Sequence, residues 1–313
     1  MAVDAFSGTT ALADQVVSAY DRSAYFALRD NAVFDQFAKV KPGNVTSPGS
    51  SVAFLFWGDL TAATATLSET VDTDAVALSD SLVTVTPQEY GNAVLLSIKV
   101  RSTSFALGFD SDVANVVAYN LLDSLETVAE IALTAGGTVA YHSGATDEDQ
   151  LITGTDVMTM NEIRRQVAIA RKASVQPFSG ERFAAVMNPD VAYDLMIDTA
   201  TGGWGNFHIR QDGEPWYNGQ VGRAAGVDFI ESPRARINLT GGTGSTDDTY
   251  TTYIFGNESF AKAEVIPPHI VPGPVTDKLM RFMPLGWHAY MAYSVLRTAS
   301  LRRLITAANL GGT

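Results

Sequence analysis

The sequence predicts an α+β protein, and three stretches of the chain carry this prediction. Residues 42–98 are rich in Val, Thr, Ala and Leu, which is typical of a long β-ribbon. Residues 110–135 place apolar side chains at helical spacing. Residues 183–275 combine strand-like and helix-like segments, which indicates a separate α+β lobe.

The ribbon segment cannot bury its own apolar side. It holds six acidic residues between Pro42 and Ile98 and no Lys or Arg. A two-stranded ribbon is marginally stable in water, and no second layer is available within the segment. We therefore expect the ribbon to lie on another surface, and a second copy of the protein is the simplest candidate. A hairpin turn is predicted at Tyr90-Gly91-Asn92.

Three helices are expected before the lobe. An N-terminal arm over 11–40 repeats apolar residues at helical spacing. The long helix has Asp110 or Ser111 as its cap, and about 25 residues at 1.5 Å each give a rod of roughly 38 Å. The next helix starts at a capping box, Thr159-Met160-Asn161-Glu162, and ends with Arg171 and Lys172.

The lobe is expected to contain the strand FAAVMN, a short helix capped by Asn188 with Pro189 at its first position, and the strands DFIES, TYIFG and AEVIP. The C-terminal segment LGWHAYMAYSVLRTASLRRL fits two strands that return to the long helix.

Composition excludes several classes of protein. The 313 residues suffice for one large or two ordinary domains, with 46% hydrophobic and 18% charged residues. The absence of cysteine excludes disulfides, thiolate zinc sites and cysteine nucleophiles. No basic and apolar leader precedes the arm, and no run reaches the ~18 apolar residues of a membrane span. We expect a protein that works in an aqueous compartment without membrane contact.

The net charge of −13 lies in the middle third of the chain. Residues 1–41 hold five acids and four bases, 42–163 hold sixteen acids and two bases, and 164–313 hold thirteen acids and fifteen bases. Such asymmetry favours a surface that meets a basic patch or repels a polyanion, although simple solubility explains it equally well.

No catalytic or metal motif emerges from the sequence. The four histidines have no zinc-type spacing, and HExxH, GxSxG and SxxK motifs do not occur. The acidic run at 147–149 lacks the pattern of a calcium loop. We therefore expect no catalytic residue, no cofactor and no metal. Trp204 and Trp216 lie in loop-like contexts, where subunit contact and local core packing are equally good readings.

The order of elements resembles the major capsid proteins of tailed bacteriophages, which have the Hong Kong 97-type fold. The segments AATATLSETVDTDAV and VTPQEYGNAV resemble the extended loop of the subgroup typified by the N4 phage coat protein. NGQVGRAAGVDFIES resembles part of the axial domain, and LGWHAYMAYSVLRTASLRRL resembles the C-terminal segment, with His288 where Lys is more usual.

This resemblance implies an N-terminal arm (1–41), an extended β-loop (42–104), a peripheral domain with a spine helix (105–182), an axial domain (183–276) and a C-terminal return to the peripheral domain (277–313). Hexamers and pentamers would form an icosahedral head that encloses double-stranded DNA without reading its sequence, assembled in the cytoplasm of a bacterial host. A portal, a separate scaffold protein and a decoration or cement protein are the implied partners. With no Lys in 42–98, the loop cannot donate a Lys–Asn cross-link.

The residues expected at contacts between subunits fall into two groups of opposite charge and a set of aromatic side chains. They are Trp57, Glu69, Asp72 and Asp74 on the loop, Arg164, Arg165, Arg171 and Lys172 on the receiving helix, and Trp204 and Trp216. Two alternatives stay open, namely an encapsulin-like nanocompartment shell and a hydrolase with an unrecognised carboxylate site.

Overall fold

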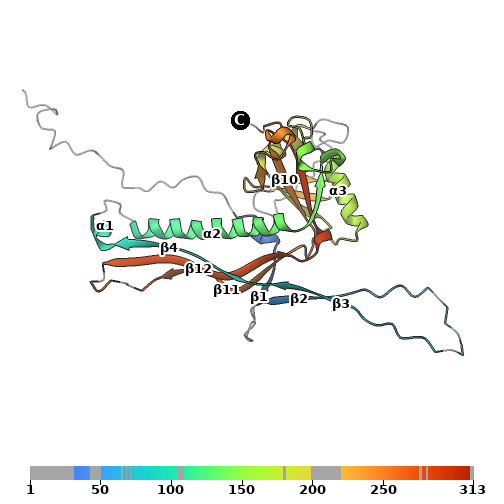
Figure 1. The fold of residues 1–313 in the computed structure, drawn as a ribbon, viewed down its shortest axis with the longest axis horizontal. Helices are drawn as coiled ribbons and strands as arrows, with labels where there is room; N and C mark the ends of the chain where they lie inside the picture. The colour runs from blue at the N-terminus through green and yellow to red at the C-terminus, as the bar shows by residue number, and fades with distance from the viewer. Residues whose placement is uncertain are drawn as a thin grey trace, which may run out of the picture.

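The structure is a computed structural model that describes residues 32–42, 51–64, 66–67, 69–70, 72–103, 109–178, 181–198, 220–274, 277–279 and 281–310. Within these ranges the chain forms a long sheet covered by one long helix, a lobe at one end of that helix, and a thin ribbon that projects beneath the lobe (Figure 1). None of the helices in the described residues has the length and apolar character of a membrane span.

The long sheet has four strands in the order β1 (Lys39–Pro42), β11 (Phe260–Pro272), β12 (Phe282–Val295) and β4 (Gln88–Ser97). β1 runs parallel to β11, and the other two pairs are antiparallel. The helix α2 (Phe109–Ala135) lies along this sheet, and the short helix α1 (Ile98–Thr103) follows β4 at the end far from the lobe (Figure 1).

The helix α2 buries one side against both sheets. Val117, Leu125, Ala129 and Leu133 are buried, at intervals of four or eight residues that keep them on one face. They share a core with Trp287 and Met291 of β12 and with lobe strands. Trp287 donates its indole N–H to Asn120 Oδ1 at 2.8 Å, so the polar atom of this buried ring is satisfied.

In its described residues the lobe contains a second sheet and two α-helices. Its strands run in the order β5 (Thr138–Tyr141), β13 (Leu301–Thr306), β10 (Thr249–Phe255), β6 (Phe183–Met187), β8 (Val227–Glu231) and β7 (Gln220–Ala224), with β9 (Ile237–Asn238) beside β10. The helices α3 (Met160–Lys172) and α4 (Pro189–Ile197) contribute buried residues to the core on this sheet. β10 and β6 are buried along their whole length, as expected for central strands.

Polar contacts fix the lobe on α2. The Tyr253 hydroxyl of β10 donates to Glu130 Oε1 at 3.0 Å and lies 2.7 Å from the Thr134 hydroxyl. Arg234, after β8, pairs with Asp123 at 2.5 Å. These contacts and the shared apolar core make the lobe and the spine helix one body.

The ribbon consists of β2 (Val52–Trp57) and β3 (Asp80–Val85), paired antiparallel from Val52↔Val85 to Trp57↔Asp80. Val52, Phe54 and Val85 pack at its base on Ala and Leu side chains of β11 and β12 and of the residue after β12. This contact supplies the apolar surface that a two-stranded ribbon lacks. Beyond Trp57 and Asp80 the described residues between 58 and 79 form a loop (Figure 1).

Several predicted elements are confirmed by the structure. The long helix ends before Gly136-Gly137, and α3 begins after Thr159, whose hydroxyl accepts from Glu162 N at 3.4 Å. The strand FAAVMN is β6, and Asn188 caps α4 with Pro189 at its first position. Each of these signals depends on residues close together in the chain, which is why local sequence was sufficient.

The predicted hairpin at Tyr90-Gly91-Asn92 is wrong. These residues lie inside β4, which pairs with β12 over its whole length. A Cβ on Gly91 would stand 2.8 Å from the Trp287 carbonyl oxygen, so glycine is required there by a close approach of two backbones rather than by a turn. The ribbon therefore joins β2 to β3, and β4 is a strand of the long sheet.

Other placements also differ from the prediction. The strand AEVIP is part of β11 in the long sheet rather than the lobe, and of the two C-terminal strands only β12 lies beside α2, because β13 joins the lobe sheet. Asp110 and Ser111 lie inside α2, which begins at Phe109, so neither is its cap. The end of the predicted arm helix is a 3₁₀ helix (Phe34–Phe37) followed by β1, and residues 11–31 lie outside the described residues.

The buried carboxylate of Glu126 generates the first prediction. It accepts from the backbone N–H groups of Val33 and Phe34 at 2.5 and 2.7 Å. Burial raises the pKa of Glu126 above its ordinary value of 4.5, against the opposing effect of these two hydrogen bonds. A carboxyl whose pKa is raised on folding binds more protons in the folded state, so its contribution to stability falls as pH rises from 4.5 through the raised pKa.

We expect Glu126→Gln to remove this part of the pH dependence while keeping an oxygen acceptor. Urea unfolding of both unassembled proteins between pH 4.5 and 8 gives the test. The free energy of unfolding of the wild type should fall relative to that of the variant as pH rises, and parallel curves would contradict the assignment.

The docked base of the ribbon generates the second prediction. Phe-to-Ala changes at buried positions cost about 3–5 kcal/mol, so Phe54→Ala should release β2 and β3 from β11 and β12. Amide hydrogen exchange measures this release as faster exchange in both ribbon strands. The neighbouring Leu55 is half exposed and points to the other side, so Leu55→Ala is the matched control. Equal exchange in both variants would count against the packing described.

Candidate assembly interface

The outward face of the ribbon presents apolar side chains to solvent. Leu55 and Leu82 are direct cross-strand partners and are 50% and 58% exposed. Trp57 follows on the same face with 66% exposure. Cross-strand apolar pairs normally stabilise a sheet by excluding water, so this face has the composition of a surface that becomes covered.

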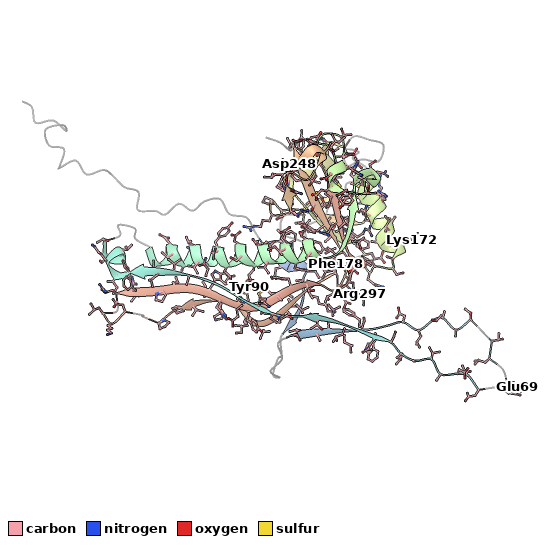
Figure 2. All side chains as sticks on the ribbon, in the orientation of Figure 1. Glu69, Tyr90, Lys172, Phe178, Asp248 and Arg297 are labelled. Carbon is pink, nitrogen blue, oxygen red and sulfur yellow. The ribbon has the colours of Figure 1, made fainter. Side chains whose placement is uncertain are left out.

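The loop over 58–79 extends the same pattern. Its described residues are exposed, including Leu67, Val76 and Leu78. Glu69 stands at the far end of the loop, away from the lobe and the long sheet (Figure 2). The predicted contact residues Asp72 and Asp74 are likewise exposed. The loop therefore offers apolar and acidic side chains together, and within the described part of the chain no second layer lies beneath it.

The receiving helix predicted from the sequence carries a basic stripe. Arg164, Arg165, Arg171 and Lys172 are all exposed on α3. The first two are each seven residues before the last two, which places the four on one side of the helix, about 12 Å from end to end. Arg165 contacts Glu162 at 3.3 Å, but Glu162 is itself buried. The solvent side of α3 thus holds bases and no exposed acid.

A groove of about 490 Å³ lies where the ribbon leaves the body. It is lined by apolar side chains of β1 and β2 and by Lys39, Glu258 and Arg297. Glu258 contacts both bases, and its hydrogen bond from Lys39 lowers the pKa of this carboxyl despite partial burial. The Arg297 guanidinium also stacks 5.0 Å from the ring centre of Phe56. The groove is therefore apolar with one excess positive charge.

Sequence reasoning missed a second basic region at the other end of the molecule. Lys99 and Arg101 on α1 and Lys278 and Arg281 near the turn between β11 and β12 are all exposed. Arg281 pairs with Asp277 at 2.6 Å. The sequence does show that Lys99 and Arg101 are the only two bases in the acidic middle third, but not that β11 and β12 place two further bases near them.

The same end of the molecule carries an apolar groove of about 330 Å³. It lies between β4, the start of α2 and the β11–β12 turn, and its lining is almost entirely apolar. The exposed side chains of Leu95, Val100 and Leu279 lie on neighbouring segments. Contiguous exposed apolar surface of this kind marks contact sites in soluble proteins.

The tryptophans divide between these surfaces and the core. Trp57 is exposed on the ribbon, whereas Trp287 of β12 is buried against α2. Trp204 and Trp216 lie outside the described residues, so their role as contacts stays a prediction. Among the residues that the structure describes, no group of three or more His, Asp or Glu side chains is arranged to hold a metal ion.

Comparison with known proteins gives a fold but no family by sequence. No family model matches the chain. No curated protein matches it in sequence either. Solved structures match over nearly the whole chain at low identity.

The capsid of Ralstonia phage GP4 matches with a TM-score of 0.79, 13% identity, and 96% and 97% coverage of this chain and that chain. The capsid of cyanophage Pam1 matches with a TM-score of 0.76, 14% identity and 100% coverage of both. The head of Helicobacter pylori bacteriophage KHP40 matches with a TM-score of 0.71, 12% identity and 98% coverage of both. The fold of this chain is therefore the Hong Kong 97-type fold of tailed-phage major capsid proteins, as the resemblance of its sequence predicted.

Proposed function

We propose that this chain is the structural subunit of an icosahedral phage head and has no enzymatic role. The observation that carries the proposal is the ribbon and its loop, which project from a folded body with apolar and acidic side chains in water. In a monomer, such an element exposes apolar surface to water and lowers the solubility of the protein. Its apolar side chains are buried only when a neighbouring copy covers them. The full-length likeness to phage capsid structures supports the same reading.

The architecture suits contacts of the head-to-tail type. The projecting loop and the surfaces that would receive it are different parts of the chain, so a contact between copies is heterologous, and a rotation that closes gives a ring. We infer that such rings are hexamers and pentamers. The lobe is proposed as the axial domain near the ring axes, and the long sheet with α2 as the peripheral domain.

The basic side of α3 is the proposed receiver of the acidic loop. It presents four bases without an exposed acid, while residues 42–98 hold six acids and no base. Exposed ion pairs give only about 0–1 kcal/mol each. The apolar residues Leu67, Val76 and Leu78 would add buried area, and repetition over many copies would multiply the effect.

The remaining partners follow from the proposed role. Packaged double-stranded DNA would be held without base readout, because a chain with a net charge of −13 has no broad basic footprint. A portal, a separate scaffold protein and a decoration or cement protein would complete the particle in the bacterial cytoplasm. The loop has no Lys within 42–98, so it would lock by non-covalent contacts. A nanocompartment shell with enzyme cargo differs in contents, and nucleic-acid analysis of purified particles distinguishes the two.

Removal of the loop tests this function directly. Joining Leu60 to Ser79 deletes the projecting segment and keeps the last ribbon pair, Trp57↔Asp80. We expect the wild type, expressed with the genes that flank it, to form closed particles, and the deletion variant to stop at small oligomers. Sedimentation and electron microscopy measure this, and circular dichroism shows whether the body still folds. Normal shells from the folded deletion variant would overturn the proposed role of the loop.

Charge reversal tests the proposed receiver. Glu69→Lys, Asp72→Lys and Asp74→Lys together should weaken assembly, because up to about 3 kcal/mol per contact is removed and repulsion is added. Adding Arg164→Glu, Arg171→Glu and Lys172→Glu to the same chain should restore particle yield.

The matched control reverses Lys99 and Arg101 in the chain with the reversed loop. Restoration by this control and not by the α3 changes would move the receiver to the far end of the long sheet.

A further inference from the structure

Two histidines on neighbouring strands of the long sheet face each other. Both lie on the side of the sheet away from α2. His269 of β11 and His288 of β12 are direct register partners. Their ring centres are 5.9 Å apart and the ring planes are almost perpendicular, at 88°. Trp287, the residue before His288, points to the opposite side, where it packs on α2. The shell proposed above gives neither histidine a role.

A β-bulge creates this pairing. Ile266 pairs with Tyr290, but His269 pairs with His288, so β11 contains one residue more than β12 over this interval. A bulge of this kind re-aims the side chains that follow it. Pro267 and Pro268 occupy the bulge, where their missing N–H groups cost no ladder hydrogen bond. Without the extra residue, the two histidines would not share a register position.

The bulge also orients one imidazole. His269 Nδ1 lies 2.8 Å from the carbonyl oxygen of Pro267. A carbonyl can only accept, so Nδ1 carries the proton and donates, which leaves the lone pair on Nε2. Metal-binding histidines are held in the same way, with one ring N–H donated to a carbonyl or carboxylate and the other nitrogen on the metal.

The space around the pair is open. A hollow of about 560 Å³ is lined by both histidines and by Gly91, Asn92, Ala93, Val271, Gly273, Pro284, Gly286 and Trp287. None of these described lining residues carries a formal charge, and the glycines leave room beside the rings. Gly91 pairs with His288, and Glu89 pairs with Tyr290 two residues further along β12. Because side chains alternate between the faces of a sheet, the Glu89 carboxylate lies on the same face as the histidines.

We propose that His269 and His288 form a two-histidine site for a divalent transition metal of the zinc, nickel and copper group, with water in the remaining positions. A metal 2.0–2.1 Å from Nε2 lies about 3.2 Å from the ring centre. Two such ligands at the tetrahedral angle put the ring centres about 5.2 Å apart, which is within about 1 Å of the observed spacing of 5.9 Å. Rotation of His288 about its broad χ2 torsion closes the difference, while the Pro267 carbonyl keeps the ring of His269 in place. The bound ion would tie the bulge of β11 to β12.

Zinc binding to the unassembled full-length protein tests the site without reference to shell assembly. Isothermal titration calorimetry with ZnCl₂ should show that the wild type binds zinc. The zinc affinity should fall by more than about tenfold in His269→Ala and in His288→Ala, because loss of a residue that only supports a metal ligand already lowers affinity by about that factor. Zinc should also raise the melting temperature of the wild type and leave that of each variant unchanged.

His142→Ala is the matched control. This variant removes a histidine from the lobe, where His142 contacts Asp156 at 3.2 Å, and it should bind zinc as the wild type does. The proposal would be overturned if the wild type bound no zinc. It would also be overturned if all three variants kept the wild-type affinity, which would place the bound zinc elsewhere on the chain.

Discussion

The simultaneous burial of α2 against two sheets is the contact on which the rest of the molecule depends. Its C-terminal half packs Leu125, Ala129 and Leu133 into a core shared by β12 and the lobe strands. Because one rigid rod of 27 residues carries both contacts, the lobe and the long sheet hold a defined relation to each other. The Tyr253–Glu130–Thr134 cluster adds polar contacts that have directional geometry.

The ribbon depends on the same frame. Its base is held only because β11 and β12, positioned by α2, present small side chains to Phe54 and Val52. Past this point the described residues have no supporting layer, and Leu67, Val76, Leu78 and the acids Asp72 and Asp74 face water. The protein is thus well packed in one part and incomplete in another. That combination is the one expected of the proposed assembly subunit, because a self-sufficient chain would cover such surface itself.

Local signals predicted the helices well and the strand partners poorly. The capping residues Thr159 and Asn188 act within a few residues, so the sequence alone located α3 and α4. Gly91 appeared to mark a turn, but its role is a close approach to the Trp287 carbonyl nearly two hundred positions away. Which sheet a strand joins depends on such distant contacts, and β11 and β13 were misplaced for that reason.

The candidate contacts divide in the same way. The acidic loop and the bases of α3 were visible as composition and helical spacing, whereas Lys278 and Arg281 near α1 became visible only once β11 and β12 were placed. The bulge at Pro267 shows the same limit, since two histidines nineteen residues apart in the chain become neighbours through one extra residue in a strand. No local rule relates them, because antiparallel register is set by the whole length of both strands.

A cryo-electron microscopy reconstruction of particles made by this chain tests the central claim most directly. The account predicts closed shells of five- and six-membered rings in which residues 58–79 of each copy lie on α3 of a neighbouring copy. In these shells the Leu55–Leu82 face of the ribbon is also covered by a neighbour. Shells in which this segment projects into solvent, or contacts only its own chain, would contradict it.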